Sequence, residues 1–232
     1  MGKYNAFEIV KTFEQAICDY TGAPYCVSVN SCTNALFLCL KYQYNNRQIG
    51  IEKPSKFNPN YNQLITYVEI PKLTYVSVPM QIMHAGFGVI FRDEDWQGIY
   101  QLKPFNIWDA ARRFRKDMFE EVNIIEDLAR DNTSMVYVCV SFHWSKILGI
   151  QQGGAILTNN LDFDTWARRA RFDGRTEGVA PKDDPIRELG WHMYMSPEIA
   201  AEGLVRLMHL KGYNPDLPRD NYPDLSLLKV FQ

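Results

Sequence analysis

Two hydrophobic periodicities alternate along this chain, and this alternation constrains its fold more than any other feature. Residues 24–29 and 135–141 are short continuous apolar runs, which are typical of buried strands. Between such runs, apolar residues recur at helical spacing, as they do from Ile9 to Ile17. Because strands that alternate with helices usually form a sheet covered on both faces, we expect an α/β fold. The expected architecture is a three-layer α/β/α arrangement around a mostly parallel central sheet.

The local signals place most of these elements. Asn5 and Glu8 have capping spacing at the start of the first helix, and Gly22 ends it. Further strands are expected at 64–70, 87–91, 105–108 and 155–158, and further helices at 35–40, 75–84, 162–171 and 197–211. We expect one large domain over residues 1–211. The prolines that follow Gly212 predict an extended C-terminal tail over residues 212–232, either a plain terminus or an arm against a partner subunit.

Charge and hydropathy exclude several classes of protein. The 25 Lys and Arg residues are balanced by 27 Asp and Glu residues, so the chain has no basic footprint for nucleic acid. No apolar run approaches the roughly 20 residues that a membrane helix needs, and the first residues do not resemble a signal peptide. We therefore expect a cytoplasmic protein that binds neither nucleic acid nor a membrane.

The cysteine and histidine residues do not predict a metal site. The five cysteines are an odd number without C-x-x-C spacing, which is typical of reduced, buried thiols. The four histidines form neither an H-x-x-x-H nor an H-E-x-x-H pattern. We expect no metal-dependent chemistry.

Lys146 has the most informative surroundings of the lysines. It follows the apolar run 135–141 and precedes the paired glycines Gly153 and Gly154. Most lysines are solvated surface charges, so this position alone assigns no role. A lysine whose pKa is lowered by burial or by neighbouring cations can form a Schiff base with an aldehyde such as that of pyridoxal 5'-phosphate. That cofactor also needs N–H donors for its phosphate, a carboxylate for its pyridine nitrogen and a flat face for its ring.

The sequence offers a residue for each need. Cys32 and Thr33 open a predicted helix directly after a strand, where a dianion can be held. Asp109 follows a predicted strand and precedes two small alanines, and Tyr75 also follows a strand. Each has an ordinary structural explanation as well: a helix cap, a turn aspartate and a core tyrosine.

Taken in order, these motifs resemble the DegT/DnrJ/EryC1/StrS family of pyridoxal-phosphate-dependent sugar aminotransferases. The similarity runs from about Phe7 to Leu210. The matching motifs are Phe13-Glu14, Tyr20–Ala23, Ser31–Leu36, Pro71–Ser77, Ala85-Gly86, Asp109–Ala111, Ser141–Lys146 and Gly153–Ile156. The resemblance implies the large domain of an aspartate aminotransferase fold type I protein. The chain stops near the point where the family's small C-terminal domain would begin, so we expect that domain to be largely missing.

The resemblance also implies roles for individual residues. Lys146 would form the Schiff base and move a proton during catalysis. Asp109 would keep the pyridine nitrogen protonated, and Tyr75 would stack on the ring. The remaining cofactor contacts would come from Cys32, Thr33 and Ser141 to the phosphate and from Ala111 to the second ring face. The implied reaction moves an amino group from glutamate or glutamine to a keto sugar, which we expect to be nucleotide-linked. The resemblance also implies a homodimer with its active site at the interface.

Four departures from the family pattern leave alternatives open. Trp108 and Arg112 replace the usual Glu and the usual Gln or His beside the aspartate, and residues 190–194 lack the usual asparagine and arginine. A βα unit between Asp93 and Asp109 is also expected to be absent. A reduced cofactor-binding or interaction protein without turnover is therefore an alternative. Dehydration or epimerisation is a third possibility, although dehydrating relatives replace the lysine with histidine.

The aspartate itself has two alignments. Asp127, in the segment 123–129, also resembles the family motif and lies 19 residues before Lys146, whereas Asp109 lies 37 residues before it. We favour Asp109 because small residues follow it, where a planar ring must pass, whereas Leu128 follows Asp127.

Overall fold

The computed structural model describes residues 5–46, 51–53, 65–129 and 135–232. In these residues the strands form two sheets. The five-stranded sheet has the order β1 (Tyr25–Val29), β8 (Gly154–Thr158), β7 (Tyr137–Ser141), β6 (Ile107–Asp109) and β5 (Tyr100–Leu102). The three-stranded sheet has the order β2 (Ile51–Lys53), β3 (Ile65–Pro71) and β4 (Gly88–Arg92).

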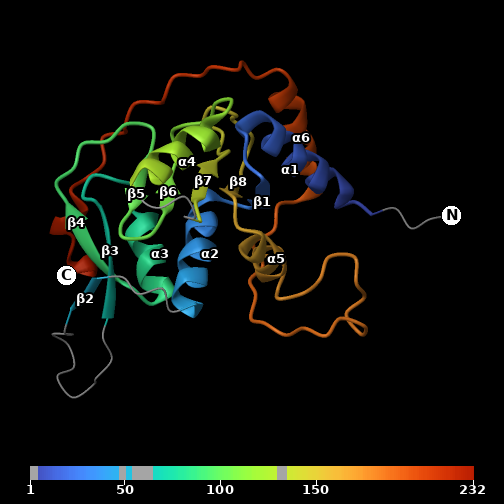
Figure 1. Ribbon diagram of the computed structural model, residues 1–232, viewed down its shortest axis with the longest axis horizontal. Coiled ribbons are helices and arrows are strands. Elements are labelled where there is room, and N and C mark those ends of the chain that lie inside the picture. The colour runs from blue at the N-terminus through green and yellow to red at the C-terminus, as the bar shows by residue number, and fades with distance from the viewer. Residues whose placement is uncertain (1–4, 47–50, 54–64, 130–134) are drawn as a thin grey trace.

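Helices cover both faces of the larger sheet. They are α1 (Glu8–Thr21), α2 (Cys32–Asn45), α3 (Ser77–Ala85), α4 (Met118–Ala129), α5 (Leu161–Ala170) and α6 (Pro197–Met208). Helices α1, α4 and α6 lie on one side, and α2, α3 and α5 lie on the other (Figure 1). Side chains alternate accordingly along β7, where Val138 and Val140 pack toward the first group and Tyr137 and Cys139 toward the second. The predicted three-layer α/β architecture is confirmed.

The prediction of a mostly parallel sheet is wrong in detail, because both sheets are mixed. Only β6–β7 and β3–β4 pair in parallel among the described strands, and the other pairs are antiparallel. Parallel neighbours need a long crossover, usually a helix. The connection from β7 to β8 contains no helix, and residues 103–106 join β5 to β6 in a short turn. Both connections therefore return the chain antiparallel. The structure also contains α4, β2 and β5, which the sequence patterns do not predict.

The strand ends gather at one edge of the larger sheet. Strands β1, β6 and β7 all end there, at Val29, Asp109 and Ser141, and β8 begins there at Gly154. Helix α2 starts just after β1 and lies so close to β8 that a Cβ atom on Gly154 would meet the Cys32 nitrogen at 2.5 Å. Glycine at this position lets the first turn of α2 reach the sheet edge.

The C-terminal tail lies against its own chain. It is extended except for two 3-10 turns, Leu225–Leu227 and Lys229–Phe231. The Leu217 N–H donates to the Arg112 carbonyl at 2.9 Å, and the Leu225 N–H donates to the Lys72 carbonyl at 3.0 Å. Leu225 is fully buried, so it anchors the far end of this segment. In Figure 1 the tail leaves α6 and crosses above the sheet to reach β3 and β4.

Candidate active site

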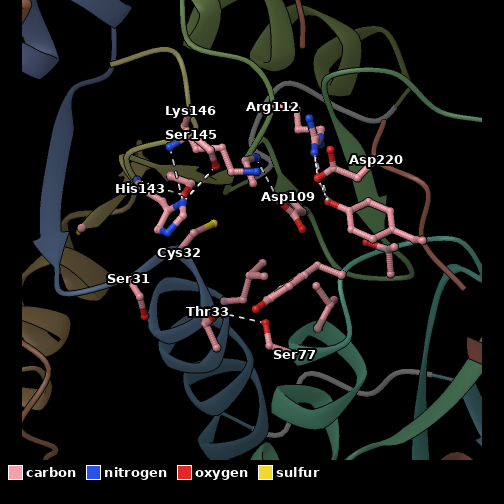
Figure 2. A pocket seen from close by; sticks show the side chains of 18 of the residues that line it. Ser31, Cys32, Thr33, Ser77, Asp109, Arg112, His143, Ser145, Lys146 and Asp220 are labelled. Atoms are coloured by element: carbon pink, nitrogen blue, oxygen red, sulfur yellow. Dashed lines mark hydrogen bonds and ion pairs between the residues drawn. The ribbon is translucent and has the colours of Figure 1, made fainter. Parts of the chain in front are cut away.

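A pocket of about 260 Å³ opens at the edge where β1, β6 and β7 end, far larger than a water site. All seven residues that the sequence analysis selected line this pocket, and Figure 2 shows several of them. They are Cys32, Thr33, Tyr75, Asp109, Ala111, Ser141 and Lys146. The structure therefore brings together residues that are up to 114 positions apart in the chain (146 − 32).

Hydrogen-bond donors gather where α2 and α3 begin. The Ser31 hydroxyl caps α2 by accepting from the Asn34 N–H at 3.1 Å. The N–H groups of Cys32 and Thr33 have no acceptor in the described part of the chain. The Thr33 hydroxyl lies 2.9 Å from the hydroxyl of Ser77, the first residue of α3. Free N–H groups, hydroxyls and the positive end of a 14-residue helix suit a phosphate dianion.

Asp109 is the buried carboxylate of the pocket. One oxygen accepts from the Ala111 N–H at 2.9 Å, and the other accepts from the Tyr100 hydroxyl at 2.7 Å. The Tyr100 oxygen also lies 2.7 Å from the Thr74 hydroxyl, so the three side chains form a buried chain of hydrogen bonds. Burial raises the pKa of Asp109, while the bonds from Tyr100 and Ala111 and the charges of Lys146 and Arg112 oppose that rise. A carboxylate has about four acceptor sites, so Asp109 can accept a further donor from the pocket.

Lys146 lies in the turn that follows β7. Its backbone N–H donates to the His143 carbonyl at 2.8 Å. Its ammonium group makes no hydrogen bond or ion pair with the described residues, and Figure 2 shows its side chain at the pocket. Burial and then the charge of Arg112 lower the pKa of Lys146, and Asp109 and Cys32 act against this change. A lowered pKa and a free amine are the properties that a nucleophilic lysine needs.

The tail supplies one wall of the pocket. Asp220 and Tyr222 line it, and the Tyr222 ring lies 6.4 Å from the half-exposed Tyr75 ring. Arg112 holds this wall, because its guanidinium donates to the Pro218 carbonyl and forms an ion pair with Asp220. These contacts join residues more than 100 positions apart, and an extended segment carries no local signal that would predict them.

Other pocket residues were missed or left without a role. Ser77, Tyr100's partner Thr74 and His143 all line the pocket. The His143 Nδ1 atom lies 2.9 Å from the Ser145 hydroxyl, which also faces the pocket (Figure 2). Ser77 could have been found as the polar residue that opens a predicted helix, as Thr33 was.

The structure separates the two aspartate alignments. Asp109 ends β6 in the pocket, whereas Asp127 belongs to α4, which lies on the opposite face of the sheet with α1. None of the α4 side chains that the structure describes, those of residues 118–124, lines the pocket. The segment 190–194 runs beside the start of α2, where the Met193 carbonyl accepts from the Asn30 N–H at 2.8 Å. None of its residues lines the pocket.

The described residues offer neither a metal site nor a membrane-spanning helix. They contain no group of three or more His, Cys, Asp or Glu side chains placed to hold a metal ion. None of their helices has the length and apolarity that crossing a bilayer requires.

The fold is similar to solved aminotransferase structures. A sugar aminotransferase from Micromonospora echinospora is 18% identical with a TM-score of 0.61, covering 89% of this chain and 62% of its own. For a DegT/DnrJ/EryC1/StrS aminotransferase from Brucella abortus the identity is 20%, the TM-score 0.59, and the coverage 89% and 60%. A protein described as a putative PLP-dependent aminotransferase, from Bacillus cereus, is 17% identical with a TM-score of 0.60. The match covers 89% of this chain and 59% of that protein.

This chain spans about 60% of the length of those solved structures. A comparison with curated protein sequences finds no match. The model of the DegT/DnrJ/EryC1/StrS aminotransferase family matches residues 2–118, which is half of the chain. Together with the pocket at the strand ends, this match shows that the chain belongs to the DegT/DnrJ/EryC1/StrS aminotransferase family.

Proposed function

We propose that this protein is a pyridoxal-phosphate-dependent aminotransferase. The observation that carries the proposal is the convergence of Lys146, Asp109 and the free N–H groups of Cys32 and Thr33 on one pocket. Each of these groups meets a different need of the cofactor: Lys146 suits its aldehyde, Asp109 its pyridine nitrogen, and the N–H groups its phosphate. Bound there, the cofactor would supply an electron sink for negative charge on the substrate carbon.

The chain's own residues divide the work. The N–H groups of Cys32 and Thr33 and the hydroxyls of Thr33 and Ser141 hold the phosphate. Asp109 holds a proton on the pyridine nitrogen by its negative charge. Lys146 would hold the cofactor's aldehyde carbon through Nζ, and once the substrate amine had displaced it, the freed Nζ would move a proton at the substrate carbon. Its lowered pKa keeps a larger share of the amine neutral and ready to accept that proton.

Tyr75 and Ala111 are assigned to the two faces of the cofactor ring. The Ala111 N–H donates to Asp109, so residue 111 is held next to the carboxylate. Because alanine is small, the ring can lie beside it; a larger side chain would displace the ring from the carboxylate. Tyr75 is half-exposed at the pocket wall, where it can cover the ring and exclude water.

We further propose a keto sugar, in a nucleotide-linked form, as amino acceptor, and glutamate or glutamine as donor. Family membership and the similarity to a sugar aminotransferase support this substrate class. One similar structure is a GDP-4-keto-6-deoxymannose-3-dehydratase, with 14% identity and a TM-score of 0.64, so the fold alone does not select the reaction. The presence of Lys146 favours transamination over dehydration.

The test is an absorbance spectrum of the purified protein with added pyridoxal phosphate, before and after glutamate. We expect a visible band that is lost in Lys146→Ala and that glutamate bleaches as pyridoxamine phosphate forms. A band that no amino donor changes would instead favour the alternative, a cofactor-binding protein without turnover. Absence of any band that depends on Lys146 would refute the proposal.

We also propose that the active form is a homodimer with the active site at its interface. The pocket opens beside Trp144, whose large apolar side chain is 71% exposed and neighbours the pocket residues His143 and Ser145. Tryptophan is enriched in interfaces between protein chains, which supports placing a partner at this edge of the pocket. Light scattering at micromolar concentration should give twice the chain mass of 26.9 kDa. A mass of one chain under conditions that support activity would contradict this assembly.

A further inference from the structure

Arg112 is a buried cation in the pocket wall, and the partners of its side chain within the described ranges all come from the C-terminal tail. Its side chain is only 7% exposed. The guanidinium donates to the Pro218 carbonyl, forms an ion pair with the Asp220 carboxylate and lies 3.4 Å from the Tyr222 hydroxyl. Its Nε atom is buried without a hydrogen-bond partner among the described residues. Arg112 thus has donor capacity to spare in a pocket that opens to small molecules.

Asp220 is mostly exposed, whereas the Arg112 side chain that it pairs with is buried. Its side chain is 62% exposed, so it can leave Arg112 for water at small cost. The tail is fixed on either side of it: Asp216 pairs with Arg113 at 2.6 Å, and Leu225 is fully buried. Release of Asp220 therefore needs only a local movement between these two anchors.

The charges of the pocket define which ligand group could replace Asp220. Removing the carboxylate from a buried arginine without a substitute is costly, so the replacement must itself be an anion. A guanidinium binds a carboxylate through two parallel N–H donors, which makes carboxylates its preferred small partners. Arg112 and Lys146 line the same pocket, and the charge of Arg112 helps to lower the pKa of Lys146. An amino acid could thus place its carboxylate on Arg112 while its amine lies near Lys146.

We propose that Arg112 is a binding site for the carboxylate of a small-molecule ligand, and that Asp220 is an internal competitor which the ligand displaces. The inference rests on the proposed function, since the carboxylate it would bind there belongs to the amino donor. Asp220 keeps Arg112 neutralised between turnovers and sets the concentration of donor that the site requires. The carboxylate site itself does not need the cofactor.

The experiment measures binding of glutarate, a dicarboxylate without an amine, to the full-length chain by calorimetry. Asp220→Asn should tighten glutarate binding by about tenfold or more, because a site that is occupied most of the time by its competitor binds correspondingly weakly. Tyr222→Phe should have a smaller effect in the same direction, since the Tyr222 hydroxyl holds Asp220 at 3.2 Å. Arg112→Gln should abolish the gain when combined with Asp220→Asn.

Asp95→Asn is the matched control. Asp95 is an exposed carboxylate that pairs with an arginine of the tail, Arg219, at 3.1 Å, but it does not line the pocket. It should leave glutarate binding unchanged. Equal glutarate affinities in the wild-type, Asp95→Asn and Asp220→Asn proteins would overturn the proposal, as would equally strong binding of uncharged glutaramide.

The outcome can be separated from that of the proposed function. Tighter glutarate binding by Asp220→Asn without any Lys146-dependent absorbance band would support the carboxylate site and refute the aminotransferase. The opposite outcome is a normal band that glutamate bleaches at the same concentrations in the wild-type and Asp220→Asn proteins. That result would support the aminotransferase and refute the competition by Asp220.

Discussion

Glu14→Ala is expected to lower the free energy of unfolding by about 3–5 kcal/mol, because it leaves a buried cation without its main counter-ion. Glu14 on α1 is 3% exposed. Its carboxylate forms ion pairs with the fully buried Arg171 and with Arg168, and accepts from the N–H and hydroxyl of Ser28 at 2.8 and 2.7 Å. These contacts tie α1 to β1 and to the end of α5, so one carboxylate holds three elements together.

The same cluster makes stability depend on pH. Burial acts to raise the pKa of Glu14, but the charges of Arg171 and Arg168 outweigh it and lower the pKa to about 2. The folded-state pKa is thus below that of the unfolded chain. The stabilisation is therefore complete above the unfolded value near 4.5 and is lost as pH falls toward 2.

Thermal unfolding of the wild-type and variant proteins measures this effect. A loss of this size corresponds to a decrease in Tm of about 10 °C for a chain of this length. Glu8→Ala on the same helix is the control, because the Glu8 side chain is 63% exposed and pairs only with surface groups; its Tm should match the wild type. The two variants should also converge in stability as pH falls to about 2, the folded-state pKa of Glu14. A Glu14→Ala protein as stable as Glu8→Ala at neutral pH would show that the cluster contributes little.

Local sequence signals predict most of the helices and strands, but they do not predict how distant segments of the chain pair. Gly22 adopts a left-handed conformation at φ 78° and ends α1, as its position in the pattern indicates. Strand direction was misjudged because it depends on whether a connection carries a helix, and the β7–β8 loop has none. Helix α4 does have a local signal that could have predicted it, because Met118, Phe119 and Val122 show the apolar spacing of a buried helix face.

The residues of the candidate site show the same difference between local patterns and long-range contacts. Residues at strand ends and at the start of α2 were predicted because each position follows from a local pattern and because their order resembles the family's. The sequence does not predict Tyr100 or Asp220 as site residues, since each reaches the site through a contact that no local pattern encodes. Strand β5 has only three residues, and Asp220 belongs to an extended tail. The sequence shows that Arg112 differs from the usual family residue. Its contacts cannot be predicted, because they are made with a tail more than 100 residues away.

Asp109→Asn is expected to reduce the rate of the glutamate half-reaction by about 10²–10³-fold, the usual cost of removing one preorganised electrostatic partner. Asparagine keeps the shape of the side chain but carries no charge to hold a proton on the pyridine nitrogen. Single-turnover loss of the visible band on adding glutamate measures this rate. Asp127→Asn, which changes the aspartate of the alternative alignment, is the matched control and should react at the wild-type rate. A slow Asp127→Asn protein beside a normal Asp109→Asn protein would reverse the assignment.

Tyr100→Phe tests how the buried hydrogen bonds support Asp109. The Tyr100 hydroxyl donates to the ionised carboxylate, so its loss should raise the Asp109 pKa further above its ordinary value. Because the cofactor needs the ionised form, its affinity falls as pH drops through that pKa. We therefore expect the acid limb of pyridoxal-phosphate binding to move to higher pH in Tyr100→Phe. Thr74→Val, which leaves the Tyr100–Asp109 bond in place, should move it less. If the limb is the same in Tyr100→Phe as in the wild type, Tyr100 only packs against Asp109, and the charge on that carboxylate is maintained by Ala111, Lys146 and Arg112 alone.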